Sequence, residues 1–197
     1  VPQNYVLDRL DQTVARAFER ALKRLAGQGA RIGEIAFPAL DELAAVYATA
    51  SFAVAEAYAW HRKLLAERRA DYDPRVASRI EPGAKMTAAD YIVLRRRRAE
   101  LIAGADATTA PFDAVLMPTV PIVAPKLSEL VEDADYYRLN ALILRNCALG
   151  NFLDRCAATI PIQQPGELPV GLMLMGEHGG DRRLLSVAAA AEAALAG

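Results

Sequence analysis

The sequence contains little cysteine, little histidine and no long apolar run, and each shortage excludes a class of protein. Its 197 residues include two cysteines and two histidines, too few for a disulfide framework or a clustered zinc site. No apolar stretch approaches the roughly 20 residues that a membrane helix requires. The first residues also lack the basic and hydrophobic regions of a signal peptide. We therefore expect a cytoplasmic protein without a metal site and without membrane contact.

An excess of charge of one sign is also absent. Lysine and arginine number 23 against 24 aspartates and glutamates, which leaves a formal net charge of -1. The field that attracts nucleic acids or anionic membranes is therefore missing. The one charge run, Arg95 to Arg98, distributes its guanidiniums around a helix axis because successive helical residues do not share a face. We interpret it as a solvated collar and expect no nucleic-acid partner.

What the sequence does contain is apolar material, at 53% of its residues. At this length the chain can bury a substantial core, and we predict one domain over residues 1–197. The chain starts at Val1 rather than at methionine and enters a helical pattern almost at once. We therefore expect a segment of a longer polypeptide.

The periodicity of the apolar residues predicts helices that alternate with short strands. A capping aspartate, Asp11, opens the first helix, and Thr87 with Asp90 has the spacing of a capping box. The expected helices cover residues 11–27, 38–65, 87–105, 135–149 and 181–195, with one turn near Pro74 in the loop 71–83. The expected strands cover residues 31–37, 114–117, 157–162 and 170–175. This order predicts an α/β fold with a mixed sheet flanked by helices, in which the last two strands are antiparallel neighbours.

Few side chains have the surroundings that catalysis needs. His61 lies on the apolar stripe of the second helix, where it is either a general base or a core histidine bonded to a carbonyl or a tyrosine, and we favour the core histidine. His178 stands in an exposed turn. Cys147 and Cys156 lie in apolar runs, where burial raises the pKa of a thiol and blocks access, so we expect neither to be a nucleophile.

The serines and one threonine lead to different conclusions. No serine sits in a G-x-S-x-G elbow or a Ser-x-x-Lys pair, so this chain contains no recognisable serine nucleophile. Thr119 follows a short buried strand at the start of a proline-rich loop, Pro118 to Pro125. Such strand ends often line ligand crevices, and a rigid surface connection fits the same pattern. The spacing alone leaves both interpretations open.

Four segments together resemble the closing portion of an amidase signature hydrolase. They are Met117 to Pro121, Asn151 to Pro161, Pro169 to Gly176 and Asp181 to Leu185. A weaker likeness extends over nearly the whole chain, and it includes Glu56, Tyr58, His61, Gly83, Thr87, Asp90 and Tyr91. The order and the spacing of these segments match the family.

The resemblance implies the α/β/α sandwich of that family and hydrolysis of a carboxamide C–N bond through an acyl-serine intermediate, without metal or organic cofactor. In the family, two serines and a lysine lie in a Gly/Ser-rich segment of the N-terminal half, and no such segment occurs here. The resemblance therefore implies no catalytic residue in this chain, which is expected to be inactive alone. Its implied partners are a small-molecule amide and the missing N-terminal half.

The resemblance also assigns five substrate-binding residues. Thr119 and Pro121 would border the acyl pocket, and Asn151 would shape it from the other side. Arg145 and Asn146 are further candidates, because a guanidinium there could hold a substrate carboxylate in bidentate fashion. Their alternative interpretation is a helix C-cap and a surface ion pair.

The chain departs from the family pattern, and other functions stay open. Asp154 occupies a position where glycine is frequent, and Cys156 one where proline is frequent. One alternative is a non-catalytic binding or scaffold protein that uses the face near Thr119, and another is an enzyme similar to the A-type component of an amidotransferase. Because an incomplete sheet exposes unpaired strand groups, we also expect a homodimer.

Overall fold

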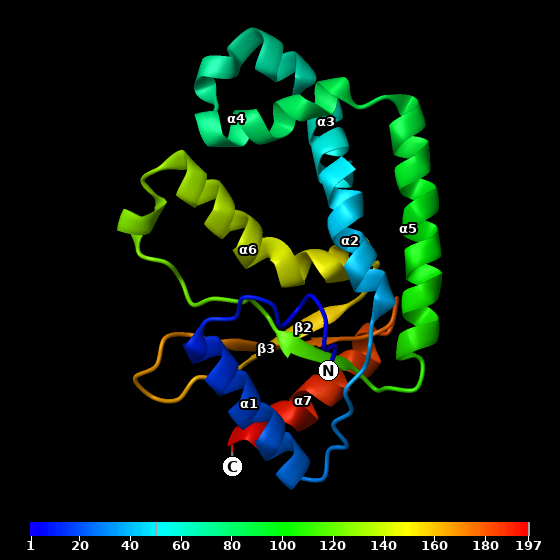
Figure 1. Ribbon diagram of the computed structural model, residues 1–197, viewed down its shortest axis with the longest axis vertical. Coiled ribbons are helices and arrows are strands. Elements are labelled where there is room, and N and C mark those ends of the chain that lie inside the picture. Colours follow the sequence, from blue (N-terminus) through cyan, green and yellow to red (C-terminus); the bar gives the residue numbers. More distant parts are fainter. Residues whose placement is uncertain (50, 197) are drawn as a thin grey trace. The chain divides into compact units, whose positions relative to one another are not determined.

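The computed structural model describes residues 1–49 and 51–196, which divide into two compact units. The first unit is Val1–Leu40 with Ile102–Gly197, and the second is Asp41–Leu101. Figure 1 shows the sheet in the first unit and only helices in the second. Two compact units do not by themselves make two domains, so the single domain over residues 1–197 stays a prediction.

A three-stranded antiparallel sheet forms the centre of the first unit. Its strands are β1 (Val115–Pro118), β2 (Ala157–Pro161) and β3 (Gly171–Met175), and the spatial order is β1-β3-β2. The expected antiparallel pairing of the last two strands is confirmed. Proline ends both β1 and β2 because it has no N–H for the ladder.

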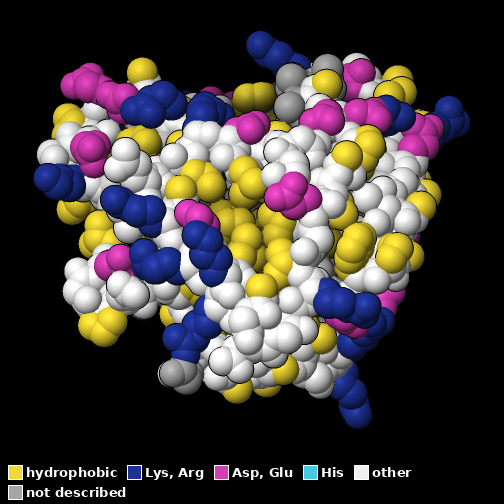
Figure 2. Space-filling model, turned by 60° about the horizontal axis from the view of Figure 1, so that its bottom comes forward, with side chains coloured by type: hydrophobic (Ala, Val, Ile, Leu, Met, Phe, Trp, Pro, Cys, Tyr) yellow, Lys and Arg dark blue, Asp and Glu magenta, His cyan; other side chains and the backbone are white. Residues whose placement is uncertain are grey.

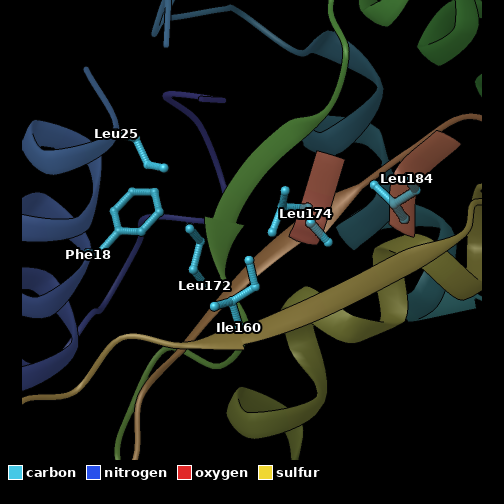
Figure 3. Close-up of a cluster of buried hydrophobic side chains, with 7 residues drawn as sticks. Phe18, Leu25, Ile160, Leu172, Leu174 and Leu184 are labelled. Atoms are coloured by element: carbon cyan, nitrogen blue, oxygen red, sulfur yellow. The ribbon is translucent and has the colours of Figure 1, made fainter. Parts of the chain in front are cut away.

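The register of the strands gives the sheet two faces. Leu172 and Leu174 of β3 point to the first face, together with their cross-strand neighbours Ile160 and Leu116. Two helices cover this face, α1 (Gln12–Gly27) and α7 (Asp181–Ala196). The buried cluster drawn in Figure 3 comprises Phe18, Leu25, Ile160, Leu172, Leu174, Leu184 and Ala188.

The second face of the sheet carries the other alternate residues. Met173 and Met175 of β3 lie opposite Met117 and Val115 of β1, and all four are buried. Helix α6 (Asp133–Phe152) runs on this side of the sheet, away from α1 and α7 (Figure 1). The first unit therefore has helices on both faces of its sheet, which confirms the α/β class.

Helices and 3₁₀ turns make up the second unit. They are α2 (Pro38–Thr49), α3 (Phe52–Arg68), η1 (Arg69–Asp71), α4 (Pro74–Ile80), η2 (Glu81–Lys85) and α5 (Ala88–Thr109), of which α2 begins and α5 ends in the first unit. Leu65, Ala77 and Ile80 form a buried cluster. Thr87 and Asp90 exchange the hydrogen bonds of the predicted capping box.

Three predictions about elements were wrong. The single helix expected over residues 38–65 is two helices, because Ser51 has an extended backbone with φ -141° and ψ 130°; Ala50, which was assigned to its apolar stripe, lies outside the described residues. The strand expected over residues 31–37 is reduced to one isolated parallel bridge between Pro2 and Ile35. The loop 71–83 contains a complete short helix, α4. That bridge is the parallel element described outside the strands, so the strands themselves show no mixed pairing.

Candidate functional site

Two threonine hydroxyls meet on the second face of the sheet, just beyond the end of β1. Thr119 continues the ladder by donating its N–H to the carbonyl of Gly171 at 2.9 Å. Its Oγ1 lies 3.2 Å from Oγ1 of Thr159 on β2. Gly171 lies on the strand between them, where a Cβ would come within 2.5 Å of the Thr119 hydroxyl. Glycine at this position is therefore what allows the two hydroxyls to approach.

Helix α1 fixes the proline-rich loop through its capping residue. One carboxylate oxygen of Asp11 accepts from the N–H of Val14 at 2.7 Å and closes the first turn of the helix. The other oxygen accepts from the N–H of Val123 at 2.6 Å. The backbone N–H of Asp11 donates to the carbonyl of Pro121 at 3.0 Å. A single residue therefore caps the helix and anchors the loop that carries Pro121, itself buried.

Helix α6 fixes the other end of this loop. Asn146 is fully buried, and its Nδ2 donates to the carbonyls of Pro118 at 2.8 Å and Val6 at 3.1 Å. The neighbouring Cys147 directs its Sγ at the carbonyl of Thr119, 3.5 Å away. Burial raises the pKa of the Cys147 thiol, as the sequence predicted. We call residues 118–121, with Thr159, the threonine wall.

Arg145 is directed at the backbone of the N-terminal segment. Its guanidinium donates to the carbonyls of Asp8 at 2.7 Å and Val6 at 3.1 Å, and its Nε donates to Asn146 at 3.1 Å. The same group stacks over the ring of Tyr5, and burial lowers the pKa of Arg145. A substrate carboxylate would have to compete with these carbonyls. The alternative interpretation as a C-cap is wrong, because α6 continues to Phe152.

Asn151 is exposed on the last turn of the same helix. The helix ends at Leu153, after which Asp154 adopts a left-handed backbone with φ 57°. The N–H of Arg155 then reaches back to the carbonyl of Gly150 at 2.9 Å, which is a Schellman closure. A left-handed residue at this position explains why glycine is frequent there in the family pattern, and aspartate is one of the few side chains that tolerate it.

Both histidines lie away from the threonine wall in the sequence and in their contacts. In the second unit, Nδ1 of His61 lies 2.7 Å from the hydroxyl of Tyr72, which confirms the predicted core histidine bonded to a tyrosine. The exposed His178 lies with Nδ1 3.0 Å from the carbonyl of Asp154. Within residues 1–49 and 51–196 there is no group of three or more His, Cys, Asp or Glu side chains placed to hold a metal ion.

Two hollows occur in the first unit apart from the threonine wall. One of about 300 Å³ is bordered by a network of ion pairs, including Arg155 with Asp106 at 2.5 Å and Arg183 with Asp113 at 2.8 Å. The other, of about 730 Å³, lies between the end of α1, helix α7 and β1. Figure 2 shows a hollow with hydrophobic side chains at the centre of the face that brings α1 and α7 forward. No described helix is long and apolar enough to cross a membrane.

Sequence reasoning found Thr119 and Pro121 but missed the residues that hold them. Thr159 could have been found from the two-residue alternation of β2, which puts it on the same face as residues 157 and 161. The second bond of the Asp11 carboxylate had no sequence signal, because Val123 is far along the chain. Thr119, Asn146 and Pro121 are brought together by these contacts, whereas Asn151 shares only the helix of Asn146.

The comparisons with known proteins agree with this architecture. The family model described as Amidase matches residues 1–185. A 2-amino-5-chloromuconic acid deaminase of Comamonas testosteroni is 31% identical over 98% of this chain and 42% of its own length. The A-type component of a glutamyl-tRNA(Gln) amidotransferase of Halobacterium salinarum is 28% identical over 98% of this chain and 50% of its own length. A crystal structure of an amidase superposes with a TM-score of 0.84 at 28% identity, over 98% of this chain and 44% of that one. The chain thus spans about half the length of the relatives it matches.

Proposed function

This chain belongs to the Amidase family, and from this premise we propose that it is the C-terminal segment of an enzyme that hydrolyses a carboxamide C–N bond in the cytoplasm. The family match over residues 1–185 is the observation that carries the proposal. The serines and the lysine that form and break the acyl-serine intermediate would lie in a part of the fold outside residues 1–197. This chain would supply part of the sheet and one wall of the pocket.

The threonine wall is suited to hold a neutral amide. Each hydroxyl of Thr119 and Thr159 can donate one hydrogen bond and accept another, so the pair can bind either the carbonyl or the N–H side of a carboxamide. Pro121 adds a rigid apolar border. We propose that Thr119 and Pro121 contact the substrate directly, with Asn151 on the opposite side of the pocket.

Arg145 and Asn146 would act on the substrate through the wall rather than by contact. Their polar atoms bond the carbonyls of Pro118, Val6 and Asp8. Buried donors that are already bonded gain little by moving to a ligand, because the carbonyls they leave would be unsatisfied. We therefore propose both as positioning residues for the loop that carries Thr119.

The test begins with the intact mass of the native polypeptide. We expect a mass about twice that of this chain, since the chain covers 42% of one relative and 50% of another. That polypeptide should hydrolyse at least one member of a panel of small carboxamides, and a serine-directed inhibitor should stop the reaction. The 197-residue chain alone should hydrolyse none. A verified longer polypeptide that leaves the whole panel intact would refute the proposal.

The wall is tested by substitution in the same polypeptide. Thr119→Val keeps the shape and removes the hydroxyl, so KM should rise while the thermal midpoint changes little. Thr108→Val is the matched control, because its hydroxyl bonds the Gly104 carbonyl within its own helix. Equal kinetic effects of the two substitutions would contradict the assignment of Thr119.

The amidotransferase relative supports a second candidate, amide transfer on a charged transfer RNA. The observation in its favour is the 28% identity over nearly the whole chain. The near-neutral net charge of this chain gives no help in binding RNA. The two functions separate in one assay: an amidase releases ammonia from a small amide without RNA, whereas a transferase component requires the charged transfer RNA.

A further inference from the structure

The outer edge of β2 presents backbone groups that the described sheet leaves unpaired. In antiparallel strands, alternate residues direct their N–H and C=O groups to the same neighbour. Gly176 donates to the carbonyl of Cys156, and Ile162 donates to the carbonyl of Val170, so the even-numbered residues of β2 bond to β3. Ala157, Thr159 and Pro161 must therefore turn their backbone groups away from β3. The edge offers two N–H donors and three carbonyl acceptors.

The opposite edge of the sheet, on β1, is different. Thr119 donates to Gly171, so the odd-numbered residues of β1 face β3 and the even-numbered residues face outward. Pro118, one of these, has no N–H, and its carbonyl already accepts from Asn146. The β1 edge is therefore closed at the end nearest the threonine wall, and β2 carries the open edge of the sheet there.

The side chains of β2 leave this edge accessible. Ala157 and Pro161 are exposed and Thr159 is half-buried, whereas Ile160 on the first face is buried and holds the strand in place. Proteins usually protect an exposed edge with a charged residue, most often lysine, or with a bulge. The segment Ala157 to Pro161 contains no charged residue, and its pairing with β3 runs through every residue without a bulge.

We propose that the outer edge of β2 binds a β-strand from the serine-bearing part of the amidase fold, an inference that rests on the proposed function. The relatives carry about as much chain again beyond the matched segment, and a strand from that part would continue the sheet. A residue opposite Thr159 would have its Cα about 4.5–5.5 Å from that of Thr159. Since Thr159 touches Thr119, strand addition at this edge brings the other segment directly beside the threonine wall.

A second copy of this chain fits the whole edge less well. If two β2 strands paired around a two-fold axis at Thr159, Pro161 of one copy would face Ala157 of the other. Proline has no N–H to donate, so both carbonyls of Ala157 would stay unpaired. A strand with a donor at that position satisfies the complete edge, which favours a segment of different sequence.

Hydrogen exchange at single residues tests the proposal. In the 197-residue chain, the amides of Ala157 and Thr159 should exchange fast, while those of Ala158 and Ile160, bonded to β3, exchange slowly. In the native polypeptide that also contains the serine-bearing segment, all four should be slow, with exchange at Ala157 and Thr159 reduced at least about a hundredfold. Fast exchange at these two amides in that polypeptide would overturn the proposal. Protection in the 197-residue chain that grows with concentration would overturn it in favour of a second copy.

A pair of variants separates the edge from the hydroxyl. Thr159→Pro removes the outward N–H without touching the bonds to β3, and in the native polypeptide it should raise exchange at Ala157 about five- to tenfold. Thr159→Val keeps the N–H and should leave that rate within about twofold. The amidase assay reads the proposed function independently: a protected edge without hydrolysis refutes only the function, and hydrolysis with an unprotected edge refutes only the docking.

Discussion

At the scale of single residues, buried polar side chains hold the threonine wall. Asn146 is completely buried and bonds two backbone carbonyls, so its amide does more for the wall than any exposed contact could. Family resemblance pointed to Arg145 and Asn146 as pocket residues. Their hydrogen bonds depend on a segment roughly 140 positions away, and no spacing pattern reveals a contact of that separation.

Replacing Asn146 tests this role. Asn146→Leu has a similar volume but leaves the carbonyls of Pro118 and Val6 without their donor, and it should lower the free energy of unfolding by about 1–3 kcal/mol in urea titration. Asn140→Leu, on the same helix and half-buried, is the control and should cost clearly less. Equal losses in the two variants would show that the Asn146 bonds contribute nothing particular.

The thiol of Cys147 gives a pH-dependent prediction. Burial raises its pKa, so at a given pH it holds less thiolate than a free cysteine, and alkylation should be slow. The pH midpoint of its alkylation rate, followed by peptide mass spectrometry, should lie higher in the folded chain than in urea. The stability linked to this group is present below the unfolded pKa and declines as pH rises through the folded pKa. A folded midpoint at or below the unfolded one would contradict the burial argument.

At the scale of elements, close approaches and helix ends decide whether a residue can be replaced. Helix boundaries predicted from caps agree well with the structure, as Asp11 and Thr87 show, because a cap is a local interaction. The predicted continuous helix over residues 38–65 failed because its apolar stripe continues past Ser51, whose extended backbone leaves no mark in the periodicity. The predicted strand over residues 31–37 failed because a strand needs a partner, and periodicity does not supply one.

Gly83 shows a close approach between two elements of the second unit. A Cβ there would lie 2.4 Å from Cβ of Tyr58 and 2.6 Å from the carbonyl oxygen of Val54 in α3. Gly83→Ala should therefore lower the free energy of unfolding by about 1–3 kcal/mol. Gly104→Ala meets no atom within 4 Å and should raise stability by about 0.5–1 kcal/mol, since alanine favours a helix. Chemical denaturation of both variants checks the prediction, which a neutral Gly83→Ala would contradict.

The end of α6 provides a second prediction at this scale. Asp154 holds a left-handed backbone that costs a side chain roughly 1–2 kcal/mol. Asp154→Gly should recover most of that cost and raise the thermal midpoint, because the exposed contact with His178 contributes little. Asp154→Ala keeps the Cβ and should not gain stability. If glycine lowers the midpoint below that of alanine, backbone strain is not what the Schellman closure imposes here.

At the scale of the whole molecule, the core of the first unit joins segments from opposite ends of the chain. Phe18 and Leu25 of α1 meet Leu184 of α7 across the first face of the sheet (Figure 3). The apolar periodicity of each segment showed that it needed a partner. It could not show that these two helices share one sheet face, because nothing in either segment encodes the other.

Adjacent leucines on α7 test the importance of this core. Leu184 is 3% exposed within the cluster, and Leu185 is 63% exposed. Leu184→Ala should lower the free energy of unfolding by about 2–5 kcal/mol through lost burial and the cavity left behind. Leu185→Ala, with the same chemistry one position along, should stay within about 0.5 kcal/mol of the parent chain. Similar losses in the two variants, measured by urea titration, would mean that α7 does not dock as described.

The sequence by itself determined the family, the α/β class and the order of most elements, together with the absence of a recognisable serine nucleophile. These depend on local periodicity, caps and short motifs, which a linear chain displays directly. Only the tertiary structure decided that Thr159 meets Thr119, that Asp11 anchors the loop of Pro121, that Arg145 binds backbone carbonyls, and that β2 carries an open edge. Each of these depends on which distant segments pack together, and that choice is made by the burial of apolar faces over the whole unit rather than by any single stretch of residues.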